Sequence, residues 1–290
     1  MTTPNDGMTP QKWAFRLTHI LNTFSGIDRF PVEVEPLAKD ISQTLYPEDP
    51  VSLVKGAELP GFDGCLAKAP KEKKGWGIIY NNKMQSKGRI RFTLAHEFGH
   101  YLLHRTQFPG GIQCGEQDLL RWESEYAQIE HQANVFAANL LMPLDDFRNQ
   151  IDDKSKADLS ILSACAERYG VSLMATILRW IEYTERRVIL VVSRGGFILW
   201  ARSSKSAMKT GAFFRTANSS PIEVPNGSPA SGKILIFDQS LIVNHPEKTW
   251  LEYESCIEEI IISEQYDFSI SLLHLQSGSK NWSPYYSGEK

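Results

Sequence analysis

The first third of the chain switches between helical and strand-like patterns of apolar residues. Between residues 9 and 24, apolar side chains recur at helical spacing, which predicts a helix with one buried face. A second helix is expected over residues 37–45, because helical spacing continues there until Pro47 interrupts it. Short apolar runs bounded by turn-forming residues then predict strands at residues 51–54, 64–67 and 76–80. We therefore expect two helices and a small sheet.

Helical spacing dominates the middle of the chain. It predicts a helix over residues 89–104, a helix or helix pair over residues 118–142 and a further helical stretch between residues 157 and 186. Residues 106–117 contain Pro109-Gly110-Gly111 and are expected to form a loop.

After residue 186 the pattern changes to β-branched runs, so we place a domain boundary there. Residues 188–192 and 197–200 flank Gly195-Gly196 and predict a hairpin. The remaining expectations are strands at residues 233–237 and 268–274, an acidic amphipathic helix over residues 250–261, a long surface loop over residues 218–232 and a loose tail from residue 276.

Composition excludes several classes of protein. The 290 residues are 42% hydrophobic and 22% charged, enough apolar material for one large domain or two modest ones. A net charge of −3 gives no global attraction to nucleic acid or to anionic membranes. Because no apolar run is long enough to cross a bilayer and the first residues lack a signal-peptide pattern, we expect a cytoplasmic protein. The four cysteines are far apart, which favours reduced thiols over a disulfide framework or a cysteine metal site.

One motif carries chemistry: His96-Glu97-x-x-His100, inside the helix expected over residues 89–104. Residues four apart on a helix lie on the same face, one turn apart, so two imidazoles so placed can hold one divalent ion. Glu97 projects from the edge of that face, where a carboxylate can take a proton from a water that the ion activates. The rest of this helix is apolar nearly all round, which predicts that it is buried.

His104 lies on the same arc of the helix, eight residues after His96. On a straight helix that separation is roughly 12 Å, too far for both side chains to bind one ion. We therefore expect His104 to support a ligand through a hydrogen bond, or to pack against a neighbouring helix.

A third protein ligand has to come from elsewhere, because catalytic zinc usually keeps three protein ligands and one open position. The acidic candidates are Glu116, Asp118, Glu123, Glu125 and Glu130. Glu130 shares a helical face with Ala133 and Asn134, and the small alanine, like Gly99 on the first helix, permits close packing of the two helices. Asn134 could then hydrogen-bond a ligand histidine.

Two blocks of the sequence together resemble the ImmA/IrrE family of metallopeptidases. They are residues 89–100, which contain the histidine motif, and residues 130–143, with Glu130-x-x-Ala133-Asn134 and Leu140-Leu141-Met142-Pro143. The resemblance covers roughly residues 30–185. It implies a zincin-like core with His96, His100 and Glu130 as metal ligands and Glu97 as general base. It also implies zinc as the ion, with manganese as the alternative, since such ligands accept several divalent metals.

The resemblance also sets expectations for architecture and substrate. The fold class would be α+β, with a zincin-like metallopeptidase domain at residues 1–150, a helix-turn-helix-like segment at 151–186 and a C-terminal α/β domain at 187–290. That last domain would be GAF-like, similar to the radiation-response branch of the family, and could bind a small molecule. Family members typically cleave a helix-turn-helix repressor and so release genes for a stress response or for mobile-element transfer.

The helix-turn-helix-like segment also allows a different function. Two helices joined by Gly170-Val171-Ser172 have the pattern of that motif, but the second helix carries a single basic residue, Arg179. Without basic residues the phosphate contacts that supply most DNA affinity are missing, so direct DNA binding is not expected. The leading hypothesis is a metal-dependent endopeptidase that cleaves a specific intracellular protein. The alternative is a non-proteolytic regulatory protein that binds a transcription factor or DNA.

Overall fold

A computed structural model describes residues 8–115, 125–217, 220–232, 239–263 and 267–276 of the chain. The fold is mixed α+β, as expected, and divides into two compact units. The first comprises Met1–Phe147 and Cys165–Ala175, and the second comprises Arg148–Ala164 and Thr176–Lys290. Their division crosses the two helices α6 (Leu159–Tyr169) and α7 (Leu173–Tyr183). The domain limits near residues 150 and 186 stay a prediction.

The first unit contains a small sheet and several helices. Its elements are α1 (Pro10–Ser25), η1 (Gly26–Arg29), α2 (Val34–Leu45), β1 (Val51–Ala57), β2 (Phe62–Lys68), β3 (Trp76–Asn81), α3 (Lys87–His104), β4 (Gly111–Gly115) and α4 (Glu125–Leu141), with α5 (Leu144–Gln150) beginning in it. The helices expected over residues 9–24, 37–45 and 89–104 and the three expected strands are confirmed. The loop expected over residues 106–117 is wrong in part, because it contains β4.

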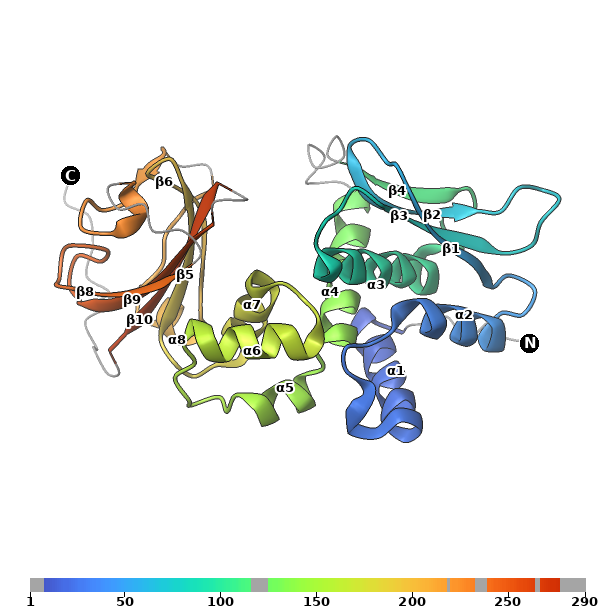
Figure 1. The fold of residues 1–290 in the computed structure, drawn as a ribbon, viewed down its shortest axis with the longest axis horizontal. Helices are drawn as coiled ribbons and strands as arrows, with labels where there is room; N and C mark the ends of the chain where they lie inside the picture. The colour runs from blue at the N-terminus through green and yellow to red at the C-terminus, as the bar shows by residue number, and fades with distance from the viewer. Residues whose placement is uncertain (1–7, 116–124, 218–219, 233–238, 264–266, 277–290) are drawn as a thin grey trace, which may run out of the picture. The chain divides into compact units, whose positions relative to one another are not determined.

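The four strands of this unit follow the order β1-β3-β2-β4. β1 runs parallel to β3, whereas β2 runs antiparallel to both β3 and β4. Figure 1 shows α3 running along one side of this sheet. A single core cluster joins Trp13 of α1, Ile78 of β3, Phe98 of α3 and Phe136 of α4. The metal-motif helix is therefore fixed between the sheet and α4.

The second unit is built on a six-stranded antiparallel sheet of order β7-β6-β5-β10-β9-β8. Its elements are β5 (Val188–Arg194), β6 (Phe197–Ser203), α8 (Lys205–Lys209), β7 (Ile222–Glu223), η3 (Pro229–Ser231), β8 (Ser240–His245), β9 (Cys256–Ser263) and β10 (Phe268–Leu275). The expected hairpin is confirmed: β5 and β6 pair through Gly195 and Gly196, whose φ angles of 56° and 80° suit a tight hairpin turn.

Two expectations for this unit are wrong, the second only in part. The helix expected over residues 250–261 is replaced by strand β9, in which Glu258 and Glu259 are both buried, on opposite faces of the sheet. Because each face of β9 buries one of these acids, the sequence lacks the alternation of apolar and polar residues that would have indicated a strand. The surface loop expected over residues 218–232 is wrong in part, because within the described residues 220–232 Val224 and Ala230 belong to the core of this unit. The strand expected at residues 233–237 and the tail after Gln276 lie outside the described residues.

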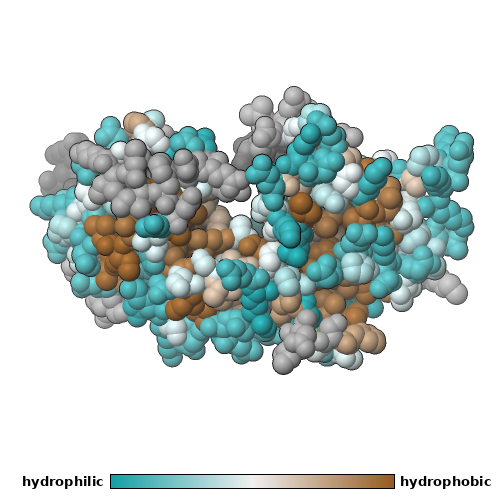
Figure 2. All heavy atoms as spheres, viewed as in Figure 1, coloured by the Kyte–Doolittle hydropathy of each residue, from teal (hydrophilic) through white to brown (hydrophobic). Residues whose placement is uncertain are grey.

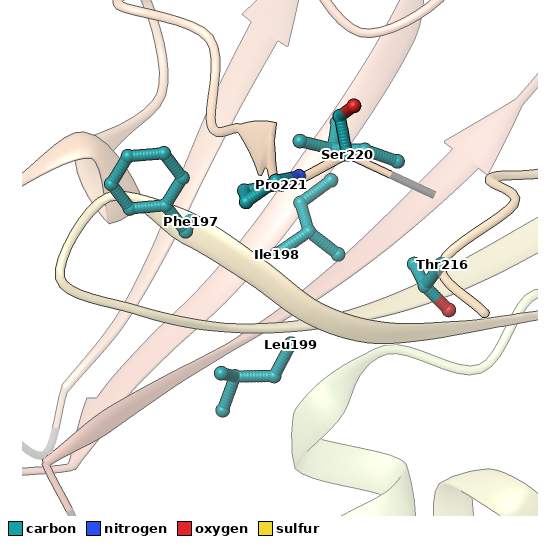
Figure 3. Close-up of a pocket in the computed structure, with 7 residues that line it drawn as sticks. Phe197, Ile198, Leu199, Thr216, Ser220 and Pro221 are labelled. Atoms are coloured by element: carbon teal, nitrogen blue, oxygen red, sulfur yellow. The ribbon is translucent and has the colours of Figure 1, made fainter. Parts of the chain in front are cut away.

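The surface of the second unit carries apolar groups among hydrophilic side chains (Figure 2). One hollow of about 440 Å³ lies where β6 meets the segment leading to β7. Figure 3 shows it between Phe197, Ile198 and Leu199 on one side and Ser220 and Pro221 on the other.

In the described part of the chain, no single helix has both the length and the apolar composition to cross a membrane. α6 and α7 meet that test only when they are joined, and they are sharply bent at the break between them.

Candidate metal centre

The local sequence explains why α3 is buried with its polar arc inward. The helix begins after Ser86, whose hydroxyl accepts a hydrogen bond from Arg89 N–H at 3.3 Å. Phe98 and Leu102 are fully buried in the core. The polar arc is buried as well, with His96 at 8% and His100 at 0% exposure. Buried imidazoles need partners, and Asn134, His104 and Glu130 supply them.

The two motif histidines and Glu130 converge on one point. His96 Nε2 and His100 Nε2 are 2.9 Å apart. Glu130 Oε2 lies 3.2 Å from His96 Nε2, and Glu130 Oε1 lies 3.1 Å from His100 Nε2. In a tetrahedral zinc site with bonds of about 2.0–2.1 Å, ligand atoms lie about 3.3 Å from each other. The three side chains therefore have the spacing and the donor chemistry to hold a divalent ion.

Small residues bring Glu130 within reach. A Cβ atom added at Gly99 would lie 2.9 Å from Phe136 Cδ1 and 3.4 Å from Ala133 Cα. α3 and α4 can pack this closely only because Gly99 and Ala133 are small, as the sequence indicated. Among the other acidic candidates, Glu125 is the first residue of α4. Glu116, Asp118 and Glu123 lie outside the described residues.

Each histidine of the pair is oriented through its second ring nitrogen. His96 Nδ1 lies 3.0 Å from Asn134 Oδ1, so Nδ1–H donates to the amide oxygen and the Nε2 lone pair points toward the site. His100 Nδ1 lies 3.0 Å from His104 Nδ1, and His104 Nε2 lies 2.9 Å from Gln132 Oε1. When His100 Nδ1–H donates to His104 Nδ1 and His104 Nε2–H donates to Gln132 Oε1, the Nε2 lone pair of His100 also faces the site.

Asn134 and His104 hydrogen-bond the two motif histidines, as the sequence suggested, whereas the part played by Gln132 was not expected. Gln132 is two residues from Glu130, so helical periodicity does not place it on the ligand face. Only the crossing of α3 and α4 brings it opposite His104.

Burial and neighbouring charges set the protonation of the cluster. Burial lowers the pKa of His100 to about 4, and repulsion from His96 and His104 acts in the same direction. Burial alone would raise the pKa of Glu130, but hydrogen bonds and positive charge from His100 and His96 hold it well below its usual range. His100 is thus a neutral imidazole beside a carboxylate at neutral pH. Burial alone would lower the pKa of His96, but its hydrogen bond to Glu130 and the charges of Glu97 and Glu130 raise it, so a metal ion that binds here would displace a proton from His96.

Glu97 is 1% exposed and lies against strand β2. A Cβ atom at Gly64 would meet Glu97 Oε1 at 2.9 Å and Thr93 Cγ2 at 2.5 Å, so the absence of a side chain at Gly64 makes room for the carboxylate. Burial together with the charge of Glu97 raises the pKa of the neighbouring Cys65 thiol to about 11. Glu97 also acts electrostatically on His96, which places its charge next to the ligand cluster.

Comparison with known proteins agrees with this geometry. Residues 66–180 match the sequence model of the Peptidase_M78 family, described as the IrrE N-terminal-like domain. The matched segment includes all of α3 and α4, and with them His96, Glu97, His100 and Glu130. No curated protein matches the chain significantly. Over residues 66–180 the chain is thus similar to the IrrE N-terminal-like domain of the ImmA/IrrE metallopeptidases, which supports a metal-dependent peptidase.

Proposed function

We propose that this protein is a zinc-dependent endopeptidase in which His96, His100 and Glu130 hold the ion and Glu97 is the general base. The observation that carries the proposal is the convergence of three ligand atoms, all within 4.8 Å of one another. A bound ion of this kind polarises the scissile carbonyl and lowers the pKa of water. Manganese is the alternative ion, because imidazole and carboxylate ligands accept both.

The protein's own groups would do the rest of the chemistry. Glu97 would take a proton from the attacking water and pass it to the leaving amine. The carboxylate of Glu97 lies against Gly64 of β2 and is close enough to His96 to act on it electrostatically. Asn134 and His104 would keep the two imidazoles in the orientation that leaves Nε2 unprotonated.

The substrate would be a specific intracellular protein, and we infer a helix-turn-helix repressor whose cleavage releases a stress or mobile-element response. The support is the resemblance of the two motif blocks to ImmA/IrrE peptidases and the family match. The same resemblance supports a zincin-like core, a helix-turn-helix-like segment around α6 and α7 and a GAF-like C-terminal part.

Direct DNA binding by the segment around α6 and α7 is not part of the proposal. Arg179, the basic residue expected on the second helix, is 5% exposed and its Nη1 donates to Glu182 Oε2 at 2.7 Å. A guanidinium that is buried and paired in this way contributes little to phosphate binding.

Replacing Glu97 with Gln tests the proposal, because it removes the base and keeps the shape. The variant and the wild type would be loaded with zinc, their metal content measured, and each incubated with a candidate repressor encoded nearby. We expect Glu97→Gln to retain zinc and to lose cleavage by about 100-fold or more. Glu167→Gln, an exposed acid on α6, is the matched control and should cleave normally. Equal cleavage by Glu97→Gln and wild type would refute the role of Glu97, and unchanged output in cells would favour a non-proteolytic regulator.

A further inference from the structure

The second unit contains a pocket of about 300 Å³ at the ends of three neighbouring strands. Asn244 of β8 pairs with Ile257 of β9, and Ile257 pairs with His274 of β10, so their side chains form one row across a face of the sheet. Lys156, from the segment before α6, and Arg186, from the segment before β5, complete this side of the lining. Pockets of this volume accommodate small metabolites.

The charge of the lining is one-sided. The residues that line the pocket include Lys156 and Arg186 but no aspartate or glutamate. No described carboxylate lies within ion-pair distance of Lys156 or of Arg186. The adjacent Arg187 differs, because its guanidinium is buried and donates to both carboxylate oxygens of Glu254, at 2.7 and 2.8 Å. The charge of Arg187 is thus neutralised by Glu254, whereas the neighbouring Arg186 lines the pocket without a carboxylate partner among the described residues.

The nearest acids already have backbone partners. Asp158 Oδ1 accepts a hydrogen bond from Ile161 N–H at 2.8 Å, at the start of α6. Glu259 accepts a backbone hydrogen bond from Leu159. These two carboxylates are therefore engaged in fixing the beginning of α6, and neither lines the pocket.

His274 provides a second, independent observation. It lines the pocket and is 6% exposed, and its Nε2 has no hydrogen-bond partner among the described residues. The closest ionic group recorded for it, Glu259 Oε2, is 3.9 Å away, beyond hydrogen-bond distance. Burial, and then the charges of Lys156 and Arg186, lower the pKa of His274 to about 4. The positive charges of Lys156 and Arg186 thus both reach the buried ring of His274, whose Nε2 has no hydrogen-bond partner among the described residues.

We propose that this pocket binds a small molecule through an oxyanion group, a phosphate or a carboxylate, held by Lys156 and Arg186. Charge-assisted hydrogen bonds from a lysine and an arginine are the strong contacts that such groups make in proteins. Ile257 and Leu275, which also line the pocket, would contact the apolar part of the ligand. The second unit would then carry a binding site separate in sequence from the peptidase motif.

Anion titrations of the full chain test the proposal. Sodium phosphate and sodium succinate would be titrated calorimetrically and by thermal unfolding, against sodium chloride at equal ionic strength. We expect saturable binding of phosphate or of succinate, with the stronger of the two identifying the group, and no saturable effect of chloride. Failure of both to bind up to about 100 mM, or the same response to chloride, would overturn the proposal.

Substitutions then locate the site. Lys156→Met and Arg186→Met should each weaken binding by about ten-fold, the usual loss for a charge-assisted hydrogen bond. Lys205→Met and Arg202→Met are matched controls, because both side chains are exposed in the same unit and neither lines the pocket. An anion that bound a metal ion at His96 and His100 would be insensitive to Lys156, so unchanged affinity in both pocket variants would refute the assignment.

Discussion

Gly99 of α3 faces the ring of Phe136 on α4 without space for a single additional carbon atom. The same crossing brings Glu130 to the two motif histidines. The distances between the three ligand side chains therefore depend on how closely α3 and α4 pack. The packing of α3 against α4 therefore controls a site that neither helix could build alone.

The first prediction is that Gly99→Ala weakens zinc binding. A Cβ 2.9 Å from Phe136 Cδ1 must push the helices apart, which moves Glu130 from His96 and His100 and costs about 1–3 kcal/mol of stability. Zinc affinity measured by competition with a chromophoric chelator should fall by about ten-fold or more. Gly110→Ala is the control, because a Cβ there meets no atom within 4 Å. Equal zinc affinity in both variants would contradict the prediction, because it would show that α3 and α4 can move apart without loss of the metal site.

The second prediction concerns the hydrogen-bond chain that ends at Gln132. Gln132→Leu leaves His104 Nε2–H without its acceptor, so the tautomer of His104, and through it the orientation of His100, is no longer fixed. Zinc affinity should fall by about ten-fold, the smaller end of the loss seen when groups that orient metal ligands are removed. The folded state should persist, because Gln132 is not in the core. Gln128→Leu, an exposed position on α4, should bind zinc like the wild type.

The convergence of His96, His100 and Glu130 could be predicted from the sequence because helical periodicity and two small residues are local signals. The spacing of His96 and His100 fixes their common face, and Gly99 with Ala133 indicates the helix contact that supplies Glu130. Gln132 was missed because its role depends on a crossing angle. β4 was missed because an edge strand is stabilised by pairing with β2, which no local pattern reveals. β9 was mistaken for a helix because Glu258 and Glu259 are both buried, one on each face of the sheet, so its sequence lacks the alternation of a strand.

The third prediction is a loss of stability of the second unit in mild acid. The unfolded chain protonates His274 below its ordinary pKa of about 6.5, whereas the folded protein does so only near a pKa of about 4. The unfolded state therefore binds more protons between these pH values, and stability falls as the pH drops through that window, by up to roughly 3 kcal/mol. Burial raises the pKa of the nearby Glu259, which acts in the opposite direction and reduces this loss.

Replacement of His274 by Phe checks this assignment. Thermal unfolding of His274→Phe should show a flatter dependence on pH between about 6.5 and 4 than the wild type. His19→Gln is the control, because His19 is exposed on α1 and its removal should leave the slope unchanged. If His274→Phe and wild type lose stability in parallel, another group accounts for the acid sensitivity.

The fourth prediction concerns the buried carboxylate of Glu258. This side chain is fully buried and accepts four hydrogen bonds: Oε1 from Ser228 at 2.8 Å and Ser271 at 2.6 Å, and Oε2 from His245 at 2.7 Å and Trp250 at 3.2 Å. Every donor points at an acceptor, which is how a charge is tolerated inside a core. We expect Glu258→Gln to destabilise the second unit by about 1–3 kcal/mol, because the amide keeps one acceptor oxygen for four donors, so two of them must reorient or lose their acceptor.

Denaturant unfolding of Glu258→Gln beside Glu252→Gln separates the loss of this network from the loss of one negative charge. Glu252 is exposed in the same unit, so its replacement should change the midpoint very little. Because residues 66–180, the peptidase-family segment, do not include Glu258, we expect zinc binding at His96 and His100 to survive in Glu258→Gln. A parallel loss of zinc binding would show that the second unit must be folded for the metal centre to form.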